Sequence, residues 1–157
     1  MRVSFTVPWV TGKERPRFAH GHAFTPKATR DRERAIAELY RAAAFAQGRP
    51  VPKADAGVPV TLRMTLTSPL PKSKPKRVQR EPYTVKPDID NAIKLVMDGL
   101  NGVAWEDDAQ VTSVSATKTD RTRNIGAAML VSVEWCDFVW LIEGFKEETW
   151  TSTTTSR

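Results

Sequence analysis

Hydrophobic and polar residues alternate along several stretches of this chain, the period expected of half-buried β-strands. Three stretches show the alternation clearly, and a fourth, at 111–119, shows it less regularly. The three clear stretches are residues 3–9, 60–66 and 127–135. The sequence therefore predicts four strands distributed over the whole length of the chain.

Two other stretches have apolar residues at helical spacing. The first is predicted to begin with Thr25 as N-cap and Pro26 at the first helical position, and to end at about Gln47, before Gly48. The second begins near Asp90 and ends at an Asn-Gly pair. Its predicted buried stripe is Ile89, Ile93, Val96, Met97 and Leu100. Together with the strands, these helices predict an α+β fold with a mixed sheet and two main helices.

The segments between these elements differ in character. Residues 15–22 are basic and rich in turn formers, which fits a loop or hairpin, whereas 68–87 combine prolines with six basic residues and predict a long mobile loop. Residues 1–136 are expected to form one domain. Residues 137–157 are expected to be a partly disordered C-terminal extension, in which the apolar stretch 138–145 packs on the body or on a partner chain.

Composition narrows the classes of protein that fit. The 157 residues suit one domain, and no apolar run approaches the roughly 20 residues that cross a bilayer. The chain has a single cysteine, Cys136, which cannot form an internal disulfide. We therefore expect a protein of the reducing cytoplasm with no membrane partner.

Charge is distributed unevenly along the chain. The net charge is +6, and 18 of the 24 basic residues precede Asp88. Residues 88–108, in contrast, contain six acidic residues and only one cation, Lys94. This insert is either a solvated acidic face or a cation-binding pocket within a surface that binds a polyanion.

The spacing of the acidic residues favours a pocket. Asp88 and Asp90, two residues apart before a helix, can face one point. A helix of about ten residues rises roughly 15 Å, and the residues after its Asn-Gly turn could return over up to roughly 20 Å. That return would bring Asp107 and Asp108 beside the first pair. Clustered carboxylates with room for water suit Mg²⁺ or Mn²⁺.

Simpler explanations exist for some of these residues. Asp90 could serve only as a helix N-cap. Lys94, one turn later, could form an ion pair with Asp90 or Asp98, or it could hold a scissile phosphate. A calcium loop of the EF-hand type lacks its ligands, and a zinc site has too few cysteines and histidines.

Residues 86–111, KPDIDNAIKLVMDGLNGVAWEDDAQV, closely resemble the core motif of the RusA family of Holliday junction resolvases. The motif is a basic residue, D-x-D-N, a lysine four residues after the second aspartate, and D-D-x-Q. KERPRF and AFTPKATRDRE, within 13–33, are similar to the basic first segment of the family. The resemblance covers roughly residues 2–135.

The resemblance implies Mg²⁺-dependent cleavage of four-way DNA junctions by a homodimer, with paired nicks that leave 5′-phosphate ends. By position in the motif, Asp88, Asp90 and Asp108 correspond to the metal ligands and Lys94 to the catalytic lysine. Asp107 corresponds to an acidic neighbour without an assigned role. Such an enzyme would act in recombination and repair in a bacterial cytoplasm, encoded by the bacterium or by a phage.

Basic residues around the acidic insert are predicted to bind DNA phosphates. They are Lys13, Arg15, Arg17, Lys27, Arg30, Lys74, Lys76 and Lys86. Two alternatives remain at this stage: a non-catalytic DNA-binding module, and a metal-dependent phosphatase of small molecules. A phosphatase would not need this much basic surface.

Overall fold

A computed structural model describes residues 1–15, 17–19, 22–48 and 53–136. Its centre is a four-stranded sheet with the order β1-β8-β4-β6. Strand β8 pairs antiparallel with β1 and with β4, whereas β4 and β6 are parallel. The strands are β1 (Arg2–Val7), β4 (Val60–Thr67), β6 (Val111–Lys118) and β8 (Ala128–Trp135). The predicted mixed sheet and all four of its strands are confirmed.

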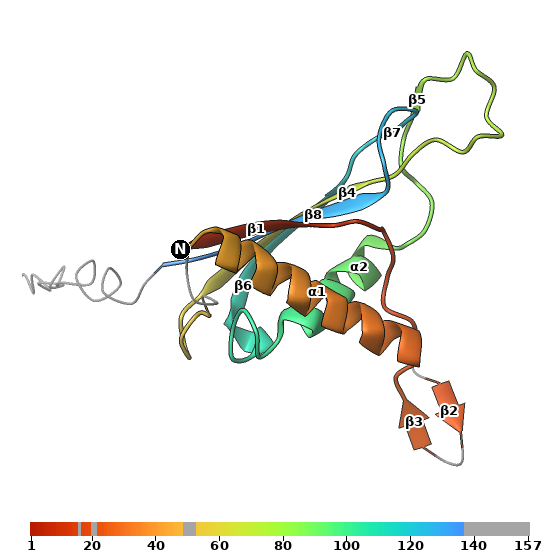
Figure 1. Cartoon of the computed structure of the whole chain (residues 1–157). Coiled ribbons are helices and arrows are strands. Elements are labelled where there is room, and N and C mark those ends of the chain that lie inside the picture. The colour runs from red at the N-terminus through yellow and green to blue at the C-terminus, as the bar shows by residue number, and fades with distance from the viewer. Residues whose placement is uncertain (16, 20–21, 49–52, 137–157) are drawn as a thin grey trace, which may run out of the picture.

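Both main helices, α1 (Lys27–Ala46) and α2 (Ile89–Leu100), pack on one face of this sheet (Figure 1). Helix α2 connects the parallel strands β4 and β6, as a crossover connection requires. Alternate residues of β1 and β4 point into the core between sheet and helices. There the ring of Phe5 meets that of Tyr40 edge-on, with 5.9 Å between the centroids. The predicted α+β fold with two main helices is therefore confirmed.

The helix starts and faces differ in detail from the prediction. Helix α1 begins at Lys27 with Pro26, not Thr25, as its N-cap residue. In α2 the buried side is centred on Leu95, with Ala92, Val96, Gly99 and Leu100, while Ile89 and Ile93 are only partly buried. The predicted stripe was therefore rotated. The reason is that α1 crosses α2 at Gly99, where an added Cβ would lie 2.9 Å from the Glu33 carbonyl oxygen.

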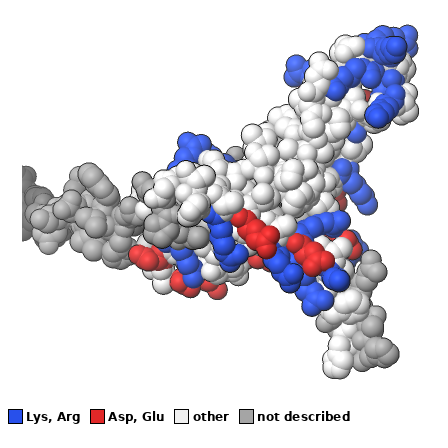
Figure 2. Space-filling view, viewed as in Figure 1, with Lys and Arg blue, Asp and Glu red and all other residues white. Residues whose placement is uncertain are grey.

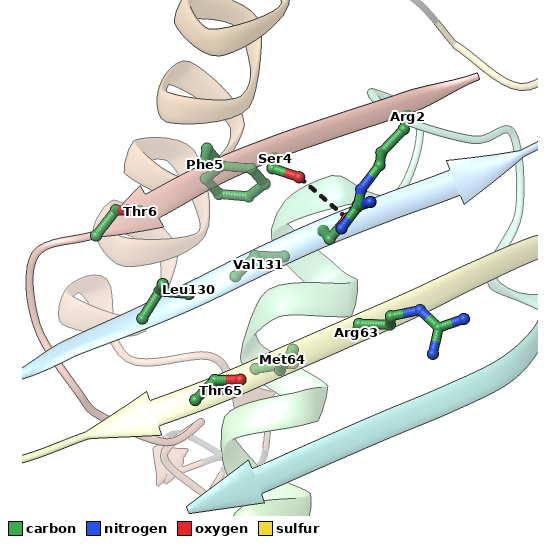
Figure 3. Close-up of a pocket in the computed structure, with 10 residues that line it drawn as sticks. Arg2, Ser4, Phe5, Thr6, Arg63, Met64, Thr65, Leu130 and Val131 are labelled. Carbon is green, nitrogen blue, oxygen red and sulfur yellow. Dashed lines mark hydrogen bonds between the residues drawn. The ribbon is translucent and has the colours of Figure 1, made fainter. Parts of the chain in front are cut away.

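Figure 3 looks onto the other face of the sheet, with the helices behind the strands. Small polar residues and Leu130 line a shallow depression of about 400 Å³ there. Arg2 and Arg63 reach over it from β1 and β4, and both approach Glu134, at 3.3 and 3.5 Å. No helix in the described part of the chain is long and apolar enough to cross a membrane.

Two short antiparallel pairs extend from this body. Strands β2 (Arg17–Ala19) and β3 (His22–Phe24) pair as a hairpin, one of the two alternatives predicted for 15–22, and its second strand extends beyond that range. Most of 68–87 is the long loop that was predicted, but it contains a short strand that was not predicted, β5 (Arg80–Glu81), which pairs with β7 (Arg121–Thr122). The pairing partner lies about forty residues away along the chain, beyond the reach of a local pattern. The predicted C-terminal extension, 137–157, lies outside the described residues.

Candidate active site

The start of α2 carries two of the predicted site carboxylates. Asp88 precedes the helix in an extended conformation, and its side chain makes no capping hydrogen bond. Asp90 lies in the first turn, and both residues are exposed. The alternative that Asp90 serves as the N-cap is therefore wrong. Neither carboxylate is used to cap the helix.

Asp88 and Asp90 line one depression of about 460 Å³. Its other walls are Asn91 and Lys94 of α2, together with residues Lys13, Glu14 and Arg15 of the segment that follows β1. That segment is anchored on the helix, because the Lys13 amide donates a hydrogen bond of 2.9 Å to the Asn91 carbonyl oxygen. The structure thus places the KER sequence near the N-terminus beside the DID sequence, which begins 75 residues later in the chain.

Gly12 makes this anchoring possible, and sequence reasoning gave it no role. A Cβ at Gly12 would lie 2.8 Å from the Asn91 Cβ and 3.3 Å from the Pro87 Cβ. We expect Gly12→Ala to displace the segment, to lower stability by about 1–3 kcal/mol, and to impair any reaction at Asp88 and Asp90. Gly126→Ala is the matched control, because an added Cβ there meets no atom within 4 Å. Equal melting temperatures and cleavage rates for the two variants would contradict this assignment.

Some basic side chains that line the depression already form ion pairs with acidic residues of the same chain. The ammonium group of Lys13 bonds the Asp98 carboxylate and lies 3.9 Å from a Glu33 oxygen. Burial raises the pKa of Glu33, and Lys13 opposes that shift. Lys13 therefore ties the segment to both helices and is less suited to contact DNA than predicted. Arg15, in contrast, is exposed and has no ion-pair partner among the described residues.

Lys94 lies over the same depression. Its ammonium nitrogen is 3.8 Å from an Asp90 carboxylate oxygen, and both side chains are 64% exposed. A pair with this exposure contributes little to stability, roughly 1 kcal/mol or less. The predicted i, i+4 contact is therefore present, and it leaves Lys94 open to solvent and to a ligand in the depression.

Asp107 and Asp108 do not join this group. After α2 the chain turns tightly, because the amides of Val103 and Ala104 both donate to the Leu100 carbonyl oxygen. Trp105 then bridges back to Asn101. The segment therefore stays at the C-terminal end of α2, roughly 18 Å along the helix from Asp88. The expectation that it returns to the start of the helix was wrong.

At that end, the side chains of Asp107 and Asp108 form hydrogen bonds with residues close to them in the sequence. Asp108 accepts a hydrogen bond of 2.8 Å from the indole nitrogen of the fully buried Trp105. Asp107 caps the short 3₁₀ helix η1 (Asp108–Gln110) in a capping box with Gln110. Gln110 in turn donates to the carbonyl oxygens of Asp55 and Val58. Asp107 thus has a structural role, which the spacing D-x-x-Q could have suggested.

In the described part of the chain, no three His, Cys, Asp or Glu side chains lie close enough together to hold a metal ion. Asp88 and Asp90 supply two carboxylates on one depression. Mg²⁺ is commonly held by one or two carboxylates, with water and substrate phosphate as the remaining ligands. The pair therefore fits a hard divalent cation, but Asp108 of the same chain does not complete the set.

The predicted DNA-binding residues belong to different elements of the structure, and Figure 2 shows lysine and arginine side chains in separate groups on one face of the molecule. Lys27 and Arg30 are exposed in the first turn of α1, and Lys86 is exposed beside Asp88. Lys76 is exposed without an ion-pair partner among the described residues, whereas Lys74 lies 2.8 Å from a Glu81 oxygen. Arg17 lies in β2, and its side chain lies outside the described part.

Comparisons with known proteins identify a family and one similar protein. Residues 8–128 match the family model described as Endodeoxyribonuclease RusA. The chain is also similar to the uncharacterized protein YqaN of Bacillus subtilis (strain 168), with 37% identity over 68 residues. That match covers 38% of this chain and 48% of YqaN, so it spans about half of the relative. On the family match, which covers most of its length, the chain belongs to the RusA endodeoxyribonuclease family.

Proposed function

We propose that this chain is a divalent-metal-dependent endonuclease that cuts four-way DNA junctions during recombination and repair in a bacterial cytoplasm. The observation that carries the proposal is the pair Asp88 and Asp90, exposed at the start of α2 and facing one depression. Membership of the RusA endodeoxyribonuclease family supports it.

The reaction would be hydrolysis of a phosphodiester bond. Bound Mg²⁺ or Mn²⁺ would polarise the phosphate and lower the pKa of an attacking water. Asp88 and Asp90 would hold the ion, and the nearby Lys94 ammonium group would hold a non-bridging phosphate oxygen or offset charge on the leaving oxygen. Arg15 and Lys86, exposed on the adjoining surface, would attract the DNA backbone.

A homodimer is part of the proposal, for a reason that the fold supplies. Asp108 is at one end of α2 and Asp88 at the other, so a site that uses all three aspartates needs a second chain. Closed two-fold dimers are the commonest homo-oligomers. Two such sites in a dimer would suit the approximate two-fold symmetry of a four-way junction and would give paired nicks.

Strand β6 offers a route to that dimer. In the described part, β6 has β4 on one side and no strand on the other, and its residues 112–115 are exposed. Asp108 precedes this strand, and Lys118 at its far end bonds the Val85 carbonyl oxygen, close to the start of α2. Antiparallel pairing of two β6 strands would therefore bring Asp108 of one chain towards Asp88 and Asp90 of the other.

The test is cleavage of a labelled four-way junction with Mg²⁺, compared with EDTA and with a linear duplex of the same sequence. We expect paired nicks in the junction alone, and conversion of a supercoiled cruciform plasmid to the linear form. Junction binding without metal-dependent cutting would support the non-catalytic module instead. Hydrolysis of a small phosphomonoester, with no junction cleavage, would support the phosphatase.

A further inference from the structure

A basic arm projects from the sheet on the side where β4 ends (Figure 1). The arm consists of residues 69–82 together with the returning segment 119–123, which contains β7. Its base is held by β5–β7 pairing and by a hydrogen bond of 2.9 Å from the Leu70 amide to the Thr122 carbonyl oxygen. Figure 2 shows lysine and arginine gathered over its tip.

Two arginines of the returning segment fix the backbone of the arm. The guanidinium group of Arg123 donates to three carbonyl oxygens, those of Lys74, Pro75 and Val78, at 3.1, 2.5 and 2.9 Å. Arg121 bonds the Glu81 carboxylate, and only 11% of its side chain is exposed. A planar guanidinium can hold several acceptors in one geometry, which an ammonium group cannot do. The tip is therefore shaped before any ligand arrives.

The charges of the arm are divided into a paired base and an unpaired tip. Glu81 and Asp120 are the acidic residues of the arm, and Lys74, Arg80 and Arg121 pair with them. Lys72, Lys76 and Arg77 are exposed and have no ion-pair or hydrogen-bond partner for their side chains among the described residues. Residues 69–80 contain no acidic residue at all. The tip thus presents three uncompensated cations on a fixed backbone.

We propose that this arm is a preformed clamp for the phosphate backbone of a second duplex, separate from the duplex at Asp88 and Asp90. The proposal rests on the proposed function and names the part of the surface that would tell branched from linear DNA. Cations on a fixed backbone lose little freedom on binding, and they bind phosphates without reading bases. Because the arm diverges from the body that carries the acidic depression, a second helix at an angle fits it better than the continuation of a straight duplex (Figure 1).

The test compares the paired variant Lys76→Ala/Arg77→Ala with the unmodified chain. Affinity is measured by fluorescence anisotropy for a four-way junction and for a linear duplex of the same sequence, in EDTA and over a range of salt. We expect junction affinity to fall about tenfold or more, and the slope of log K against log salt to become shallower by about 2, with a smaller loss on linear duplex. The matched control is Arg34→Ala/Arg41→Ala, which removes two exposed α1 cations that have no partner among the described residues.

A second variant, Arg123→Lys, tests the preformed shape at constant charge. We expect it to weaken junction binding several-fold and to speed amide hydrogen exchange within 74–78, while Lys76→Ala/Arg77→Ala leaves that exchange unchanged. Wild-type junction affinity in Lys76→Ala/Arg77→Ala, an equal loss in the α1 control, or an equal loss on linear duplex would each overturn the proposal. These binding results are independent of cleavage. If the unmodified chain binds junctions without cutting them, the nuclease proposal fails while the arm is still judged by its own comparison.

Discussion

A mixture of Asp88→Asn and Asp108→Asn chains is expected to cut four-way junctions, although neither variant should cut alone. Each change removes a predicted metal ligand while keeping the size of the side chain. In a heterodimer built as proposed, both substitutions fall in the same site. The other site then has the unchanged Asp88 and Asp90 of one chain and the unchanged Asp108 of its partner. Random exchange of chains should therefore restore about a quarter of the wild-type number of intact sites.

Asparagine is chosen at 108 because its side-chain oxygen can still accept the hydrogen bond from the Trp105 indole. Asp108→Ala would leave that buried donor unpaired and would cost about 1–3 kcal/mol, which would confuse loss of folding with loss of function. Each variant should retain its junction affinity or bind more tightly, since negative charge near a polyanion has been removed. Melting temperature and anisotropy check both points before chains are mixed.

The decisive control is a mixture of Asp88→Asn with Asp90→Asn. Those residues lie at the same end of the same helix, so every site in every dimer contains one of the two substitutions. No cleavage activity should therefore return. Light scattering at micromolar concentration establishes the dimer, and exchange of differently tagged chains shows that heterodimers form. Inactivity of the first mixture despite proven exchange would show that each site is built within one chain. Near-wild-type cutting by any single variant would remove that aspartate from the site.

Lys94→Ala is expected to slow cleavage by about 100-fold or more while leaving the melting temperature almost unchanged. The side chain is 64% exposed and meets Asp90 only at 3.8 Å, so its loss should change stability by about 0.5 kcal/mol or less. Its place beside the two carboxylates puts it within reach of a phosphate held there. The measurement is the single-turnover cleavage rate at saturating protein, together with thermal unfolding.

Arg63→Ala provides the comparison for Lys94. Arg63 also forms an exposed ion pair, 3.5 Å from a Glu134 oxygen and with 58% of its side chain exposed, but it lies on the face of the sheet opposite the helices. It is therefore away from both ends of α2, and its loss should leave the cleavage rate close to wild type. A large fall in melting temperature for Lys94→Ala, without a matching fall in rate, would favour a purely structural ion pair.

Local patterns predicted much of this fold. The alternation in β1, β4 and β8 is visible in the sequence because each strand has one face on the core and one towards solvent. Strand β6 alternates weakly because residues 112–115 are all exposed, so neither face of that stretch is buried in the core. The pairing of β5 with β7 had no local signal, since strands of two residues have no period.

Residue order, through its resemblance to the family motif, predicted a candidate site from D-x-D-N, D-D-x-Q and the lysine between them. How the two halves of that site lie depended on packing. The fully buried Trp105 and the anchored Gln110 hold the second acidic pair at the far end of α2, and the segment after β1 reaches the first pair because Gly12 has no side chain. The sequence shows which functional groups the chain carries and in what order. Which of these groups meet in space depends on contacts between residues far apart in the sequence, and local spacing does not encode those contacts.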